Sequence, residues 1–364
     1  MKTILSFDGG GVRGAISVAF LERIERILPA GGGLPLARCV DLAGGTSTGA
    51  IIAGAISLGY SASDIKDFYL ELAPRIFRRS RTRIPGLQAM FDARPLREEL
   101  ARVCGERTLE SPDILTGFAL VMKRMDTGSA WIVSNNPAGA FWNDPPDASY
   151  HGNRHYKLAD LIRASTAAPH YFAPEPIDIC AGEPPGLFVD GGVTPHNNPA
   201  LALLQLVTIP AYGYGWATGE QDLRIVSVGT GTFRDTLDAR KARRMTAAGL
   251  AIKALAGMIR DADAQVMTMM QLLGVTKTPW RINSEIGDLD GFHLPREPLF
   301  TFLRYNVRLE RDWLARELGM KLSAARVETL RQMDNPDIVP LAYEIGQAAA
   351  EAFVDPSHFE ADAT

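Results

Sequence analysis

The chain has 364 residues, of which 46% are hydrophobic and 22% charged, a balance typical of a globular protein with one large domain or two ordinary ones. A formal net charge of -4 gives no general attraction to nucleic acid, so we expect no nucleic-acid polymer as a partner. The three cysteines are widely spaced and form no CxxC pair, which argues against a disulfide framework or a metal site.

The sequence contains no apolar stretch near the roughly 18 residues of a membrane-spanning helix. The apolar run after Lys2 is also too short for a signal peptide. We therefore expect a cytoplasmic protein whose contact with the inner membrane surface is peripheral.

The start of the chain alternates short apolar runs with helical patterns. Residues 3–7 are apolar and are followed by DGGG at 8–11, which predicts a buried strand and a turn. Apolar residues at helical spacing over 12–27 predict an amphipathic helix. A second strand is expected at 40–43 and a second helix at 48–58. This alternation is typical of a three-layer α/β/α fold with a largely parallel sheet.

Later segments extend this pattern. SASD at 61–64 predicts a capping box that opens another helix, and residues 223–228 are expected to form a later strand of the sheet. The polar and Pro-rich stretches 135–154 and 168–185 are interpreted as surface loops near the active face.

Beyond residue 232 the sequence predicts a helical region at 233–273, strands at 281–286 and 299–309, and two further helices. We assign residues 1–232 to a catalytic domain and residues 233–364 to a helical and mixed extension packed on it. A lid or regulatory role for the extension is left open.

The motif GTSTG at 45–49 matches the GxSxG nucleophile elbow. Such a turn exposes the hydroxyl of its serine, here Ser47, between a strand and a helix. Gly45 and Gly49 flank it because neighbouring backbone passes too close for a β-carbon. The free N–H groups at the start of the following helix would stabilise negative charge. A plain glycine-rich turn is the alternative, and the strand and helix on either side favour the nucleophile.

The motif DGGGVRG at 8–14 also contains GxGxxG, the fingerprint of a dinucleotide-binding oxidoreductase. That function requires an acidic residue near the end of the second strand, whereas Asp41 lies near its start. The other interpretation is an oxyanion hole built from backbone N–H groups of Gly9, Gly10 and Gly11. Arg13 either braces this loop or binds a phosphate head group.

A nucleophilic serine needs a proton acceptor. In FVDGG at 188–192, an apolar run ends in Asp190 and two glycines, so the carboxylate should emerge at a strand end on the face of the elbow. Burial would raise its pKa toward neutrality and make it a workable base. The plain alternative is a turn residue that caps its own backbone. Among six histidines, His170 and His196 are the candidates for a conventional triad.

Together these segments resemble the patatin-like phospholipase family. The matching segments occur in the family's order over roughly residues 3–230: DGGGVRG at 8–14, GTSTG at 45–49, FDARPL at 91–96, ASTAAP at 164–169, DGG at 190–192 and NNP at 197–199.

The resemblance implies a Ser47–Asp190 dyad that hydrolyses acyl esters of phospholipids or neutral lipids without a metal or cofactor. It also implies Gly10 and Gly11 as oxyanion donors, with Gly9 and Arg13 shaping the loop. His170 departs from the family, whose members often carry a small or neutral residue there.

FLRYNV at 302–307 is similar to bacterial members that serve as effectors of phage defence and await a signalling nucleotide. This implies a small-molecule activator, although no residue marks its site, and a homo-oligomer is left open. A catalytically idle scaffold of the same fold would have lost Ser47 or Asp190, and both are present.

Five basic residues precede a long Met-rich helical pattern: Arg234, Arg240, Lys241, Arg243 and Arg244. A basic entry and an apolar face are typical of a helix that docks on an anionic membrane or forms a mobile lid. The alternative is an amphipathic helix packed on the core. The apolar stripe comprises Leu250, Ala254, Met258, Ala262, Val266, Met269 and Leu273.

Overall fold

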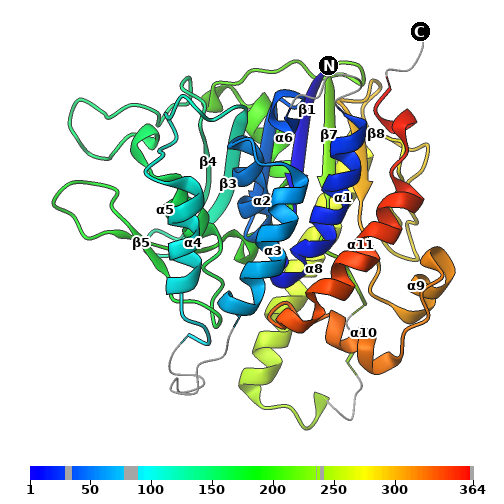
Figure 1. Cartoon of the computed structure of the whole chain (residues 1–364). Helices are drawn as coiled ribbons and strands as arrows, with labels where there is room; N and C mark the ends of the chain where they lie inside the picture. Colours follow the sequence, from blue (N-terminus) through cyan, green and yellow to red (C-terminus); the bar gives the residue numbers. More distant parts are fainter. Residues whose placement is uncertain (29–34, 78–88, 235, 238–241, 361–364) are drawn as a thin grey trace.

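The computed structural model describes residues 1–28, 35–77, 89–234, 236–237 and 242–360 and arranges them in three layers (Figure 1). The described residues form a nine-stranded sheet in the order β5-β6-β3-β2-β1-β7-β9-β8, with β4 paired to β3 beside this path. The strands are β1 (Lys2–Phe7), β2 (Leu42–Thr46), β3 (Gly117–Arg124), β4 (Ala130–Ser134), β5 (Glu175–Ile177), β6 (Gly186–Asp190), β7 (Leu223–Val228), β8 (Val275–Thr276) and β9 (Thr301–Tyr305).

The centre of the sheet is parallel. β1 pairs in parallel with β2 and β7, β2 with β3, and β9 with both β7 and β8. The pairs β3–β4, β3–β6 and β5–β6 are antiparallel. The prediction of an α/β fold with a largely parallel sheet is therefore confirmed.

Helices cover both faces of the sheet. In Figure 1, α1, α2, α3 and α11 lie in front of it, and α6 and α8 lie behind it. The helices are α1 (Gly14–Ile27), α2 (Thr48–Ser57), α3 (Ala62–Ile76), α4 (Arg94–Cys104), α5 (Leu158–Ser165), α6 (Ala200–Thr208), α8 (Ala247–Leu273), α9 (Arg311–Leu318), α10 (Ala324–Leu330) and α11 (Val339–Phe353).

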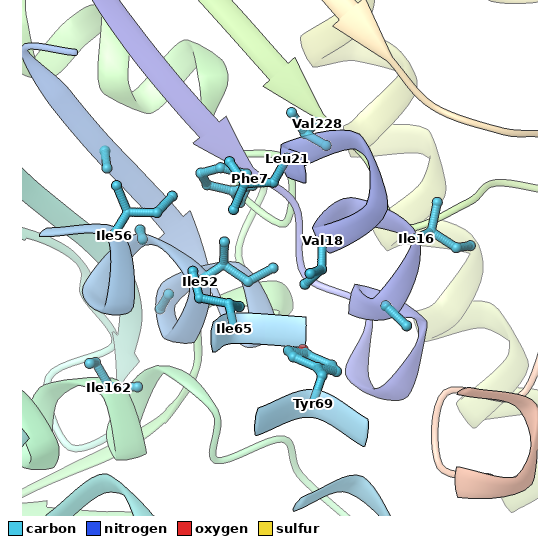
Figure 2. Close-up of a cluster of buried hydrophobic side chains, with 14 of the residues drawn as sticks. Phe7, Ile16, Val18, Leu21, Ile52, Ile56, Ile65, Tyr69, Ile162 and Val228 are labelled. Carbon is cyan, nitrogen blue, oxygen red and sulfur yellow. The ribbon is translucent and has the colours of Figure 1, made fainter. Parts of the chain in front are cut away.

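Alternate residues of each strand supply the two cores, because successive side chains of a strand point to opposite faces. Leu5 and Phe7 belong to the cluster under α1, α2 and α3, whereas Ile4 and Leu42 belong to the cluster under α6 and α8. Each fully buried large apolar side chain stabilises the fold by about 1.5–3 kcal/mol. Figure 2 shows the front core, where Phe7 and Val228 from the sheet meet Val18, Leu21, Ile52, Ile56, Ile65 and Tyr69 from three helices.

The elements predicted for the first 65 residues are present, and their boundaries differ from the predicted ones by at most three residues. The capping box is also confirmed: the Ser61 N–H donates to the Asp64 carboxylate (2.9 Å), and the Asp64 N–H donates to the Ser61 hydroxyl (3.1 Å). The predicted loop 135–154 contains no α-helix or strand, but its last two residues belong to a short 3-10 helix, η3 (Asn153–His155).

Three predictions for later segments are wrong. Residues 281–286 form no strand, because the chain turns over residues 284–286 and brings Asn283 to Gly287 in an isolated bridge. The stretch 168–185 contains β5, which gains its partner from β6. The part of the chain described after residue 300 holds three helices, α9, α10 and α11, where two were expected.

The extension shares the sheet of the preceding residues. β9 pairs with β7, and α11 packs against α1 on the front layer. Residues 1–232 and 233–364, which we assigned to a catalytic domain and its extension, are thus joined through one continuous sheet.

Candidate active site

The candidate site lies where the central parallel strands end. The carboxyl ends of β1, β2 and β7 meet at one edge of the sheet, since Phe7 pairs with both Gly45 and Val228. Ligands of open α/β sheets bind at this edge. A cavity of about 720 Å³ opens there, and Gly10, Gly11, Ser47 and Asp190 are among the residues that line it.

Ser47 lies at the tip of the turn from β2 to α2. Its φ of 55° and ψ of −123° are strained for a residue with a β-carbon. The turn is held by close packing of its glycines: a β-carbon on Gly45 would collide with the backbone of Gly49, and one on Gly49 with the carbonyl of Phe7. The elbow therefore tolerates no side chain at these two positions.

The backbone of Ser47 is held in place by a hydrogen-bonded link to α5 and β3. Its N–H donates to the hydroxyl of Ser165 (3.0 Å), which in turn donates to the carbonyl of Val121 in β3 (2.6 Å). Ser165 is fully buried at the end of α5. Our sequence analysis assigned Ser165 no role, and its only signal was its place inside ASTAAP.

Asp190 ends β6 and is only 5% exposed. Its carboxyl group accepts the N–H of Gly192 at 2.7 Å and is close enough to the side chain of Ser47 to interact with it. Burial raises the pKa of Asp190 to about 6, although the Ser47 side chain, the Gly192 N–H and Arg163 oppose the shift. A carboxylate of this basicity is a better proton acceptor than an ordinary aspartate. The hydrogen bond from Gly192 shows that Asp190 also caps the backbone that follows it, which was the alternative left open from the sequence.

The buried Arg163 supplies a positive charge near Asp190. It comes from α5, donates to the carbonyl of Ala173 (3.1 Å) and lies 3.5 Å from the carboxylate of Glu175. The sequence analysis missed Arg163 because it follows Leu161 and Ile162, where the helical pattern suggests only core packing.

The glycine loop after β1 offers two N–H groups to the cavity. The N–H of Gly9 already donates to the carbonyl of Asn197 (2.9 Å). Within the described parts of the chain, the N–H groups of Gly10 and Gly11 have no hydrogen-bond partner. Gly11 adopts a φ of 59°, and a β-carbon there would collide with the carbonyl of Met333. The predicted set of oxyanion donors therefore narrows from three glycines to Gly10 and Gly11.

Two acidic residues, the buried Asp8 and the half-buried Asp263, support this loop. Asp8 is paired with Arg304 of β9 through hydrogen bonds of 2.6 and 3.0 Å. Asp263 of α8 accepts hydrogen bonds from the Asn197 side chain (3.1 Å) and from the N–H of Asn198 (3.2 Å). Burial raises the pKa of Asp263 to about 7. Sequence reasoning missed Arg304 and Asp263, which lie far along the chain from the motifs they support.

Neither histidine considered for a triad is hydrogen-bonded to Ser47 in the described structure. His170 is exposed at the cavity wall, with a φ of 76°, and packs edge-on against Tyr171. His196 is half-buried and supplies its backbone carbonyl to the Thr46 hydroxyl (2.6 Å).

Comparison with known proteins shows the family of this chain. Residues 5–204, more than half of the chain, match the model of the patatin-like phospholipase family. The chain belongs to this family. The predicted resemblance is thereby confirmed, and no comparison supports the dinucleotide-binding oxidoreductase.

Curated relatives come from bacteria and plants. The chain is 32% identical over 230 residues to a cUMP-AMP-activated phospholipase of Escherichia coli. The aligned region covers 63% of this chain and 65% of the relative. It is 29% identical over 240 residues to a cGAMP-activated phospholipase of Vibrio cholerae (62% and 63%), and 30% identical over 269 residues to patatin group M-3 of Solanum tuberosum (67% and 65%). Each match spans less than two thirds of the relative's own length.

The described residues form neither a cluster of metal ligands nor a membrane-spanning helix. No group of three or more His, Cys, Asp or Glu side chains is placed there to hold a metal ion. No helix in these parts of the chain is long and apolar enough to cross a bilayer.

Proposed function

We propose that this protein is a serine acyl hydrolase of the phospholipase A or lipase type, which cleaves fatty-acyl esters of membrane lipids. The placement of Ser47 at the tip of its elbow beside the buried carboxyl group of Asp190, in one cavity where the Ser47 side chain lowers the pKa of that carboxyl group, carries the proposal. Family membership supports the same chemistry.

In the proposed mechanism, the Ser47 oxygen attacks the ester carbonyl while Asp190 accepts its proton. The N–H groups of Gly10 and Gly11, with the N-terminus of α2, stabilise the oxyanion. Collapse breaks the ester bond, and Asp190 returns the proton to the departing alcohol. Water then attacks the acyl-serine, Asp190 accepts the water proton, and the fatty acid leaves as the proton returns to Ser47.

The walls of the cavity suit an acyl chain. Beside Ser47 it is lined on the α3 side by apolar side chains, which remove hydrocarbon from water without polar penalties. These side chains are Phe68, Leu72, Ile76, Phe77 and Phe172.

The first test measures free fatty acids by mass spectrometry after incubation with vesicles that contain both phospholipid and neutral lipid. We expect the wild-type chain to release fatty acids in at least one of two conditions, without cGAMP and with added cGAMP. The chain would then act as a lipid hydrolase, with any dependence on cGAMP reporting a regulated effector of the antiphage type. The proposal is wrong if no lipid is cleaved under either condition and a fluorophosphonate probe fails to label Ser47.

We also propose that the protein is cytoplasmic and meets the inner membrane surface through the first half of α8. The three cysteines are free, as expected in a reducing compartment. Leu250, Leu255 and Met258 are 46–67% exposed, and Leu255 also lines the cavity. The basic residues Arg243 and Arg244 are exposed just before them.

Each of the two interpretations of this helix is supported by a different half of α8. Val266, Met267 and Met270 in the second half are buried against the sheet, whereas the first half carries the exposed apolar residues. Of the basic residues predicted to precede the helix, Arg240 and Lys241 lie outside the described residues.

The double variant Leu250→Asp/Met258→Asp is expected to bind anionic liposomes at least about 10-fold more weakly, because it removes two apolar groups and adds two negative charges. Cosedimentation with phosphatidylglycerol vesicles measures this. Leu187→Asp, at a 45% exposed position on β6, is the matched control and should bind as the wild type does. Equal binding by all three proteins would exclude α8 as the membrane contact.

A further inference from the structure

Three arginines surround one aromatic ring in the cavity that contains Ser47. Phe233 lies after β7, and the guanidinium carbons of Arg13, Arg260 and Arg331 lie 5.7, 5.8 and 4.9 Å from its ring centroid. All four residues line the cavity. We call them the arginine cluster. Phe233, Arg260 and Arg331 lie outside the segment that matches the family model, residues 5–204.

Arg13 has donors without acceptors. It is only 7% exposed, and its Nε and Nη1 atoms are buried without a hydrogen-bond partner in the described structure. Burial lowers the pKa of Arg13 to about 10, so it stays charged at neutral pH. A buried guanidinium is stable when it meets an anion that accepts its hydrogen bonds.

Of the carboxylates near the arginine cluster, two have other hydrogen-bond partners, although the charge of Asp263 also acts on Arg13. Asp8 is paired with Arg304, and Asp263 accepts hydrogen bonds from Asn197 and Asn198. Asp334 also lines the cavity. Arg331 donates to the carbonyl of Leu309 (3.1 Å) and to Glu328 (3.1 Å), which fixes its side chain beside the ring.

We propose that the arginine cluster is a binding site for a phosphodiester group. A guanidinium group binds two oxygens of a phosphate at once through its fork of N–H donors. The Phe233 ring gathers three guanidinium groups around itself by cation–π contacts. Arg13 follows Gly11 by two residues, so a phosphate at the cluster lies close to an ester carbonyl held at the glycine loop. In a glycerophospholipid only the glycerol carbons separate these two groups.

The phosphodiester of a phospholipid is therefore one source of the ligand, and this part of the inference rests on the proposed function. A cyclic dinucleotide, such as those named in the descriptions of two relatives, contains the same chemical group. Both ligands would compete for the same arginines.

The binding test uses the full chain with Ser47→Ala, which excludes turnover, and isothermal titration calorimetry. Glycerophosphocholine, inorganic phosphate and cGAMP are titrated separately into this protein and into versions that also carry Arg260→Gln or Arg331→Gln. We expect at least one phosphodiester to bind, and each substitution to weaken it by about 10-fold or more. Arg326→Gln, at an exposed position on α10, is the charge-matched control and should bind unchanged.

Thermal denaturation of each variant checks that it is folded, and Arg260→Lys provides a second variant that keeps the charge and should bind with intermediate affinity. Absence of binding by every probe, or equal binding by the glutamine variants and Arg326→Gln, would overturn the proposal. Because this test involves no hydrolysis, its outcome is independent of the proposed activity.

The selectivity test identifies the source. On the active chain, kcat/KM is measured for phosphatidylcholine and for diacylglycerol with the same acyl chains in mixed micelles. If the lipid phosphate is the ligand, Arg260→Gln and Arg331→Gln lower kcat/KM for phosphatidylcholine about 10-fold more than for diacylglycerol. Equal losses on both lipids, together with weaker binding of cGAMP, would assign the same site to a nucleotide. Equal losses with no change in binding of any phosphodiester would leave the cluster a structural role and overturn the proposal.

Discussion

Replacement of Ser47 by alanine is expected to abolish fatty-acid release, lowering kcat/KM by about 10⁴-fold or more, and to leave the fold intact. Ser47 supplies the hydroxyl that lies beside the buried carboxyl group of Asp190 in the cavity. Alanine keeps the β-carbon of the strained turn and the N–H that donates to Ser165, so the elbow should keep its shape. Mass spectrometry of released fatty acids measures the loss.

The control for this experiment is Ser63→Ala, an exposed serine on α3, which should retain full activity. Labelling by a fluorophosphonate probe should disappear with Ser47→Ala and persist with Ser63→Ala. Release that persists in the Ser47→Ala protein at more than a few per cent of the wild-type rate would assign the nucleophile to another residue.

The parts of the site that local sterics determine could be predicted from the sequence. The elbow at Ser47 requires glycine at 45 and 49, because backbone passes within contact distance of both positions. The run of glycines after β1 and the acid at the end of β6 follow the same logic, since each lies where a buried strand stops.

What could not be predicted depends on contacts between distant segments. Three successive glycines look alike in sequence, and only the carbonyl of Asn197, 188 residues away, distinguishes the occupied N–H of Gly9 from those of Gly10 and Gly11. Arg304 and Asp263 support the loop from β9 and α8 in the same way. The arginine cluster around Phe233 likewise joins three segments whose spacing gives no motif.

The failed strand prediction has a similar cause. The alternation of RINSEI at 281–286 matches the period of a strand, but the period alone does not supply a partner strand. Residues 284–286 form a turn, and Asn283 forms an isolated bridge with Gly287. The segment instead turns at Gly287, whose φ is 68°.

Replacement of Asp190 by asparagine is expected to lower kcat/KM by about 10³–10⁴-fold, because Ser47 loses its proton acceptor. The wild-type kcat/KM should rise with pH through an apparent pKa of about 6, as the Asp190 carboxyl group ionises. The residual rate of Asp190→Asn should lack this step. A pH–rate profile of both proteins on a water-soluble ester checks the expectation.

The same substitution is expected to increase the free energy of unfolding at neutral pH. Burial raises the pKa of Asp190 from 3.8 to about 6, so the folded state binds its proton more tightly than the unfolded state. This favourable term is complete below pH 3.8 and is lost as the pH rises through 6. Above pH 6 the buried charge therefore costs about 3 kcal/mol relative to pH 3, from a shift of about two pKa units.

Asparagine carries no charge and still offers an oxygen to the N–H of Gly192, so Asp190→Asn should avoid this cost. Thermal denaturation at pH 4 and pH 8 measures the effect: the gain in Tm over the wild type should be larger at pH 8. Activity that survives in Asp190→Asn and still titrates near neutral pH would assign the base to His170 or His196. A loss of activity combined with a gain in stability would identify Asp190 as a residue whose ionisation destabilises the fold and serves the chemistry, as expected for a buried general base.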